Sequence, residues 1–152
     1  KVLQDLIDYL NQKRPKESRV TEAIARLRFS SDYDNDKKTV QTIFSKIEAH
    51  FNRTDELITN AFSLEHIQDQ DRNREWTLAI GNLIPLSEKI NNEIGQNKTF
   101  EIKRIHYQKS ALKTVAEFLR HNKQARFEET NSKKWESVVA ATLYKATELE
   151  RP

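Results

Sequence analysis

SLEHIQDQ at Ser63–Gln70 and GNLIPLSEKINN at Gly81–Asn92 are the two segments around which this chain is organised. Apolar and polar residues alternate from 61 to 67, which is the pattern of a short strand. The alternation predicts that His66 lies at the far end of this strand and faces a cleft. Glu65 then points to the opposite face, unless the strand ends there.

The second segment predicts a strand followed by a helix. Residues 82–86 form a second possible strand, which Pro85 would close because proline cannot donate a ladder hydrogen bond. Ser87 follows directly and is a residue type that caps the N-termini of helices. A polar loop at 69–75 and a short apolar segment at 76–80 separate the strands, so the predicted order is strand, loop, strand, helix.

Apolar residues at helical spacing predict five further helices around this unit. Only two glycines and three prolines interrupt the chain, which also favours helix. The first two apolar stripes predict core-facing helices, the third predicts a helix that runs to about Phe51, and Ser110 is predicted to cap the fourth. The stripes are Leu3, Leu6, Ile7 and Leu10; Val20, Ala23, Ile24 and Leu27; Val40, Ile43, Phe44, Ile47 and Phe51; Leu112, Val115, Ala116 and Leu119; and Trp135, Val138, Val139, Thr142, Leu143 and Ala146. The predicted fold class is mainly α with a small embedded β-hairpin.

Length and composition limit the classes of protein to which the chain can belong. Its 152 residues fit one domain. The net charge is only +3, so any attraction to nucleic acid must come from local clusters of charge. The absence of cysteine excludes disulfides and Cys-ligated zinc, and it agrees with a reducing cytosol. We find no apolar run near the roughly 18 residues of a membrane span, and no signal-peptide pattern.

The chain starts at Lys1 and contains no methionine. We therefore expect it to be part of a longer protein that has a further domain.

Four polar residues in the two segments suggest hydrolysis of a phosphodiester. This reaction needs a base for water, a cation that neutralises the phosphate, and groups that hold both in line. His66 can be the base because imidazole titrates near neutral pH. Glu65 and Asn91 offer the hard oxygen ligands that Mg²⁺ accepts. Asn82 can orient the loop after His66 through side-chain hydrogen bonds.

Each of these residues also has an ordinary structural interpretation. A Glu-His pair is commonly an exposed polar dipeptide. Asn82 after Gly81 is typical turn chemistry, and Asn91-Asn92 is typical of the polar face of a helix. The spacing of the residues favours a site over these interpretations.

The constellation resembles the HNH, or ββα-metal, nuclease motif, in which an acidic residue and a His end one strand and an Asn starts the next. A His or Asn on the following helix completes the metal site. The nine-residue step from Asn82 to Asn91 matches the Asn-to-Asn step of HNH domains in RNA-guided DNA cutters.

A larger set of residues is similar to the C-terminal domain of GmrSD-type restriction endonucleases, which cut modified DNA. The resemblance covers roughly 43–149. The matching residues are Glu65, His66, Ile67 and Gln70; Gly81, Asn82, Leu83, Leu86 and Asn91; and Phe100, Lys103, Tyr107 and Ser110.

The chain departs from the pattern of that family at two places. The family reads Glu-His-Ile-Leu-Pro-Gln, whereas this chain has Gln68-Asp69 in place of Leu-Pro, so Asp69 could add charge near the metal. The last helix of the family tends to carry an Arg where this chain has Ala140-Ala141-Thr142. Neither change removes a proposed catalytic residue, but either could alter substrate choice or weaken the enzyme.

The resemblance implies a role for each matching polar residue. His66 would be the general base, Asn82 the positioning Asn, and Glu65 and Asn91 the ligands of Mg²⁺ or Mn²⁺. Lys103, the lysine of the family, would contact substrate phosphate, and Arg104 could widen that face. A solvated lysine at a helix start is the ordinary alternative for Lys103.

The resemblance also implies a domain organisation. Residues 1–152 would form a single HNH-nuclease domain with a ββα-metal core at about 60–95 and flanking helices at 1–51 and 110–150. The domain would be the C-terminal part of a cytoplasmic bacterial restriction or antiviral defence protein. DNA would be its substrate. An N-terminal nucleotide-hydrolysing sensing domain would supply specificity, the isolated piece would be a weak nickase, and a double-strand break would need a dimer or two successive nicks.

Two other functions fit the same sequence. The domain could be a catalytically inert helical module that binds nucleic acid or protein, or it could be an RNase that uses the same site. Metal binding between Glu65 and Asn91 separates the first alternative from a nuclease. Comparison of DNA with RNA substrates separates the second.

Overall fold

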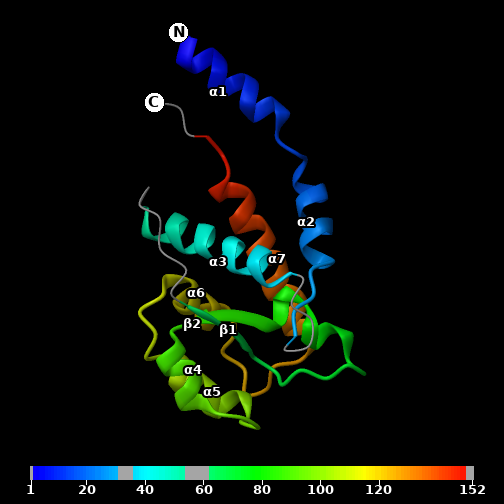
Figure 1. Ribbon diagram of the computed structural model, residues 1–152, viewed down its shortest axis with the longest axis vertical. Coiled ribbons are helices and arrows are strands. Elements are labelled where there is room, and N and C mark those ends of the chain that lie inside the picture. Colours follow the sequence, from blue (N-terminus) through cyan, green and yellow to red (C-terminus); the bar gives the residue numbers. More distant parts are fainter. Residues whose placement is uncertain (1, 31–35, 54–61, 150–152) are drawn as a thin grey trace.

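The computed structural model describes residues 2–30, 36–53 and 62–149. At its centre is an antiparallel sheet of two strands, β1 (Ser63–His66) and β2 (Leu83–Leu86). The register pairs Ser63 with Leu86 and His66 with Leu83. Helices surround this hairpin (Figure 1). The predicted class, mainly α with a small embedded β-hairpin, is confirmed.

The helices of the described residues account for most of that part of the chain. They are α1 (Val2–Lys13), α2 (Glu17–Ala25), α3 (Lys37–Asn52), α4 (Glu88–Ile94), α5 (Phe100–Tyr107), α6 (Lys113–His121) and α7 (Glu129–Ala146). Two short 3₁₀ helices, η1 (Glu75–Leu78) and η2 (Ile80–Asn82), lie between the strands.

The order of strand, strand and helix agrees with the prediction, but both strands are shorter than the predicted 61–67 and 82–86, and Pro85 has a different place. The Ser87 hydroxyl caps α4 by accepting a hydrogen bond from the Ile90 N–H at 3.3 Å. Pro85 was expected to end β2 but lies inside it, opposite Leu64. A proline is tolerated here because each strand of a two-stranded sheet has a free edge, so its missing N–H need not break the ladder.

Helix α7 packs directly against η2 and the hairpin. A Cβ added at Gly81 would lie 2.2 Å from the Ser132 carbonyl oxygen, so only glycine lets the two backbones approach this closely. The indole N–H of Trp135 donates to the Leu83 carbonyl oxygen at 3.2 Å. Trp135 also meets Phe118 edge to face, with ring centroids 5.2 Å apart. These contacts hold α7 against η2 and the start of β2.

The N-terminus of α6 is capped by a side chain from α3. Glu48, which is 3% exposed, accepts hydrogen bonds from the N–H groups of Lys113 at 2.9 Å and Thr114 at 2.8 Å. Its carboxylate also accepts from the Thr114 hydroxyl at 2.6 Å. The predicted Ser110 cap is wrong, because the Ser110 hydroxyl accepts from the Leu112 N–H before the helix starts. Burial opposes ionisation of Glu48, but hydrogen bonds from Thr114, Lys113 and Asn52 outweigh it and lower the pKa of this carboxyl.

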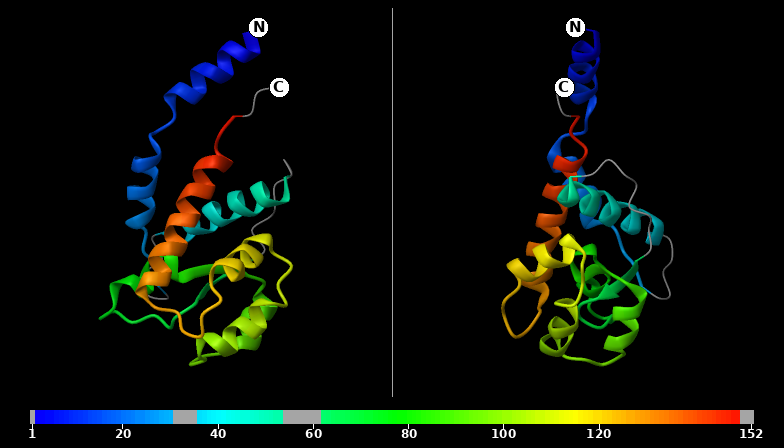
Figure 2. Two further views of the ribbon diagram at one scale, coloured as in Figure 1. Left: turned by 180° about the vertical axis from the view of Figure 1, so that it is seen from behind. Right: turned by 90° about the vertical axis from the view of Figure 1, so that its left-hand side faces the viewer.

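Helix α1 forms as predicted but does not face the core. It extends away from the rest of the chain (Figure 2), and none of its described residues is buried. Asn11 ties it to the other end of the chain, since its side chain donates to the Leu149 carbonyl at 3.1 Å and accepts from the Leu149 N–H at 3.3 Å. The Arg14 guanidinium lies over the Tyr144 ring, 4.1 Å from its centroid. The prediction that α1 packs on the core is therefore wrong, whereas α2 does bury Ile24.

None of the helices in the described part of the chain has the length and apolar character needed to cross a membrane.

Candidate active site

Successive side chains of β1 point to opposite faces of the sheet, so its polar side chains lie on both faces. Ser63 and Glu65 meet residues of α4 and α5, because Ser63 contacts Asn91 and Glu65 contacts Tyr107. His66 turns the other way, toward Phe29. Since β1 ends at His66, both side chains stay at one end of the hairpin although they leave the strand on opposite sides.

The His66 imidazole is held in one tautomer. Its Nε2 lies 3.0 Å from the Phe29 carbonyl oxygen. A carbonyl can only accept, so Nε2 carries the hydrogen and Nδ1 keeps a lone pair. The Phe29 ring stacks on the imidazole with centroids 5.4 Å apart and planes 10° apart. Burial lowers the pKa of His66, so the ring is neutral at pH 7.

Phe29 is the partner of His66 that the sequence did not predict. It lies 37 residues before His66. Its backbone N–H donates to the Leu78 carbonyl at 2.9 Å, next to an isolated bridge between Arg28 and Ala79. An apolar residue after a helix gives no sequence signal of such a contact, which depends on how α2 returns to the hairpin.

The Glu65 carboxylate faces a lysine and a tyrosine. Its Oε1 lies 2.9 Å from the Lys103 Nζ, and the Tyr107 hydroxyl donates to the same oxygen at 3.3 Å. Both contacts use Oε1, so Oε2 is the oxygen left for another ligand. Burial raises the pKa of Glu65, although Lys103 opposes this effect. Burial also raises the pKa of Tyr107 well above its ordinary value, so its hydroxyl remains a donor.

Lys103 is buried and has three oxygen partners. Its side chain is 3% exposed. Besides Glu65, the Nζ donates to the His66 carbonyl at 2.7 Å and to Asp69 Oδ1 at 3.1 Å. One ammonium group carries three N–H donors, and each has an acceptor here. Lys103 therefore joins the Glu65 side chain to the backbone at the end of β1.

Arg104, the other residue predicted to contact phosphate, also has protein partners in this structure. Its guanidinium donates to the carbonyl oxygens of Lys123 at 3.0 Å and Gln124 at 3.2 Å. It also lies 5.8 Å from the centroid of the Phe100 ring. Contact of Lys103 or Arg104 with substrate phosphate stays a prediction.

Asn82 holds the loop that follows His66. It is fully buried, at the end of η2. Its Oδ1 accepts from the Gln68 N–H at 2.8 Å, and its Nδ2 donates to the carbonyl oxygens of Gln68 and Thr77, each at 2.7 Å. The Ile67 N–H donates to the Asn82 carbonyl at 2.9 Å. A side chain with this many backbone partners fixes the path of the loop.

Asn91 lies on the same side of the sheet as Glu65. Its Nδ2 donates to the Ser63 hydroxyl at 2.9 Å, which leaves Oδ1 for another ligand. Because Ser63 and Glu65 are two positions apart on β1, they share a face. The Asn91 oxygen and the Glu65 Oε2 are thus two hard donors on one face of the hairpin.

These donors fit Mg²⁺ or Mn²⁺ better than they fit zinc. Among the described residues, no three His, Asp or Glu side chains gather closely enough to hold a metal ion. Mg²⁺ keeps several of its waters and is commonly bound through only one or two protein carboxylates, so Glu65 and Asn91 are the residues that would hold it. Structural zinc asks for four nitrogen or sulfur ligands, and this chain has no cysteine.

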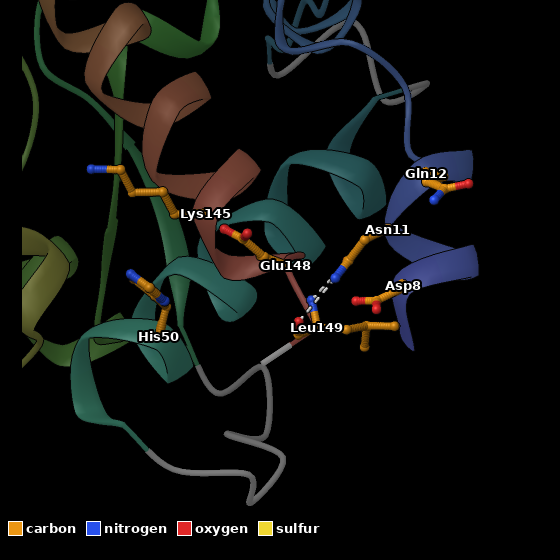
Figure 3. Close-up of a pocket in the computed structure, with 7 residues that line it drawn as sticks. All are labelled: Asp8, Asn11, Gln12, His50, Lys145, Glu148 and Leu149. Carbon is orange, nitrogen blue, oxygen red and sulfur yellow. Dashed lines mark hydrogen bonds between the residues drawn. The ribbon is translucent and has the colours of Figure 1, made fainter. Parts of the chain in front are cut away.

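Of two cavities in the described part of the chain, one borders this site and the other does not. One of about 630 Å³ is next to it and is lined by Gln68, Asp69, the start of α5 and residues 125–128. A larger one of about 930 Å³ lies between α1, the His50 end of α3 and the chain after α7 (Figure 3). None of the predicted site residues lines the larger cavity.

Comparison with known proteins places the chain in a family. The sequence model described as "GmrSD restriction endonucleases, C-terminal domain" matches residues 17–142. This range includes the hairpin, α2 to α6 and most of α7. No curated protein matches the chain, and no solved structure does. Because the family match covers most of the sequence, the chain belongs to the C-terminal domains of the GmrSD restriction endonucleases.

Proposed function

We propose that this domain is a metal-dependent DNA endonuclease of the HNH type and the nuclease module of a restriction system. The family match supports a nuclease. The order of β1, β2 and α4, with Glu65 and His66 ending the first strand and Asn91 on the helix, supports the HNH type. A sensing domain elsewhere in the full-length protein would choose the DNA to be cut.

The observation that carries this proposal is the state of His66. Its Nε2–H bonds to the Phe29 carbonyl at 3.0 Å, so the free lone pair is on Nδ1. The lowered pKa keeps the ring neutral, and a neutral imidazole can take a proton from water. Phe29 prevents rotation of the ring by stacking on it. His66 thus acts as general base through Nδ1, and the hydrogen bond to Phe29 stabilises the imidazolium that forms.

The neighbouring residues position the other reactants. Glu65 Oε2 and Asn91 Oδ1 would hold Mg²⁺ or Mn²⁺, which supplies Lewis-acid stabilisation of charge on the phosphate and the leaving oxygen. Asn82 fixes the loop after His66. A fixed loop would hold the base in place beside a bound phosphate. Attack of water on phosphorus would leave 5′-phosphate and 3′-hydroxyl ends. One such site cuts one strand.

Nicking of supercoiled plasmid by the purified domain in Mn²⁺ or Mg²⁺ tests this proposal. We expect nicking that EDTA abolishes and that His66→Ala and Asn91→Ala each reduce by about 100-fold or more, the scale of a general base or metal ligand. His121→Ala is the matched control, because His121 sits on the exposed face of α6 and pairs with Glu117. It should nick at the wild-type rate.

The same assay decides between the alternatives. Nicking that survives in pure His66→Ala protein would contradict the mechanism. Cleavage of RNA in preference to DNA would indicate an RNase with this site. If no metal concentration supports nicking, a metal titration decides between two explanations. An enzyme that is inactive without its partner domain would still bind Mn²⁺ through Glu65, whereas an inert binding module would not.

A further inference from the structure

We propose that Asp69 sets the charge of this site, because it shares Lys103 with Glu65 and so prevents the lysine from neutralising the metal ligand. Asp69 is a positioning residue in this role and acts through Lys103. The proposal rests on the proposed function, in which Glu65 helps to hold a divalent cation.

The first step is that Lys103 cannot leave. Its Nζ is buried and donates to Glu65 at 2.9 Å, to the His66 carbonyl at 2.7 Å and to Asp69 at 3.1 Å. A buried ammonium that lost these acceptors would be an unpaired charge shielded from water, which is strongly unfavourable in proteins. The lysine therefore stays beside Glu65 whether or not a cation is bound.

The second step is the charge of the cluster. Glu65 and Lys103 together carry no net charge, and a neutral pair attracts Mg²⁺ weakly. Asp69 adds one negative charge. Its Oδ1 lies within about 6 Å of Glu65 Oε1, because both oxygens contact the same nitrogen at 3.1 and 2.9 Å. At this distance a charge acts strongly on a divalent ion, even after screening. The cluster thus presents a net charge of −1 to the cation.

The third step is exposure. The Asp69 side chain is 44% exposed, whereas that of Glu65 is 12% exposed. Asp69 also lines the cavity of about 630 Å³ beside the site. Asp69 can therefore hold Lys103 from the solvent side while Glu65 turns Oε2 to a ligand.

Binding of Mn²⁺ alone, measured by isothermal titration calorimetry on the full chain at pH 7.5, tests the proposal. We expect Asp69→Asn to weaken Mn²⁺ binding about tenfold, the order expected for one partly screened charge. Asp69→Glu should bind within about threefold of wild type because it keeps the charge. Asp71→Asn is the matched control: Asp71 belongs to the same loop but pairs with Arg74 and not with Lys103. It should leave Mn²⁺ affinity unchanged. Thermal unfolding of each variant checks that the fold is intact.

The outcomes separate this proposal from the proposed function. If wild type binds Mn²⁺, Glu65→Gln abolishes binding and Asp69→Asn binds as wild type does, the role of Asp69 is wrong and the metal site stands. If wild type binds no Mn²⁺, or Glu65→Gln binds as tightly as wild type, both proposals fail. Equal weakening by Asp69→Asn and Asp71→Asn would overturn the proposal as well, because the effect would then be a general one of loop charge.

Discussion

Helices α1 and α7 start from the same kind of sequence pattern and end in opposite environments. Both carry apolar residues at helical spacing. Helix α7 packs against η2, α2 and α3 and buries Trp135, Val139 and Ala140, whereas α1 buries none of its described residues. Leu6 is 50% exposed and Trp135 is 2% exposed. A periodic stripe therefore predicts that a helix forms, but not which surface covers it.

The difference lies in what each helix meets. Helix α7 reaches the hairpin through the close approach at Gly81 and the indole hydrogen bond to Leu83. Helix α1 is attached by polar contacts, through Asn11 and Arg14, to the C-terminal end of α7 and the residues after it. Polar contacts at the surface contribute little to stability, whereas apolar burial contributes much. Stability should therefore depend strongly on the α7 side of the molecule and weakly on α1.

The largest effect is expected where α7 touches η2. Gly81→Ala places a Cβ 2.2 Å from the Ser132 carbonyl oxygen, so two backbones must separate. We expect the free energy of unfolding in urea to fall by about 3 kcal/mol or more, at the upper end of overpacking effects. Gly95→Ala is the matched control, since it has a φ of 66° but open space around its Cβ. Its φ of 66° and ψ of −165° lie in a region that residues with a Cβ rarely adopt, so Gly95→Ala should cost about 1–3 kcal/mol through backbone strain alone. Equal costs at the two glycines would contradict the close packing of α7.

An intermediate effect is expected at the cap between α3 and α6. In wild type, both carboxylate oxygens of Glu48 accept hydrogen bonds from backbone N–H groups of α6. Glu48→Gln replaces one of these oxygens with an NH₂ group, which cannot accept. We therefore expect the free energy of unfolding at pH 7 to fall by about 2 kcal/mol. Glu101→Gln, an exposed acid in the first turn of α5, should change stability by less than about 0.5 kcal/mol.

The same cap predicts a pH dependence. Because the pKa of Glu48 is lowered from its ordinary value of 4.5, its ionised form stabilises the fold above that value. This contribution is lost as the pH falls through the lowered pKa. We expect the difference in free energy of unfolding between wild type and Glu48→Gln, measured in urea from pH 7 down to 3.5, to shrink below about pH 4.5. A gap of constant size across this range would show that the charge of Glu48 does not matter.

The smallest effect is expected on α1. Leu6→Ala removes an exposed side chain and should change the free energy of unfolding by less than about 0.5 kcal/mol. Val139→Ala, which removes a buried side chain of similar type from α7, should cost about 2 kcal/mol. A loss of 2 kcal/mol at Leu6 would mean that α1 is covered in solution, and the contrast between the two helices would fail.

The parts of the site that were predictable are those defined by local chemistry. The alternation around Glu65 and His66 predicted β1, and Ser87 predicted the start of α4, because strand period and N-capping act over a few residues. Phe29 and the Glu48 cap were not predictable. Phe29 meets His66 across 37 residues, and Glu48 meets Lys113 across 65. Contacts at such separations depend on how the helices pack and leave no periodic signal.

Sequence by itself determined most of the segments that become helix or strand, although α5 was not among the predicted helices. It also determined which residue types lie at the end of the hairpin, since both follow from spacing and side-chain chemistry. Only the tertiary structure decided that α1 stays exposed and that Phe29 fixes the tautomer of His66. It also decided that Lys103, which the resemblance assigned to phosphate, is buried between Glu65 and Asp69. The physical reason is that burial and pairing of charges depend on groups brought together from distant parts of the chain, and their energies are set by that assembly.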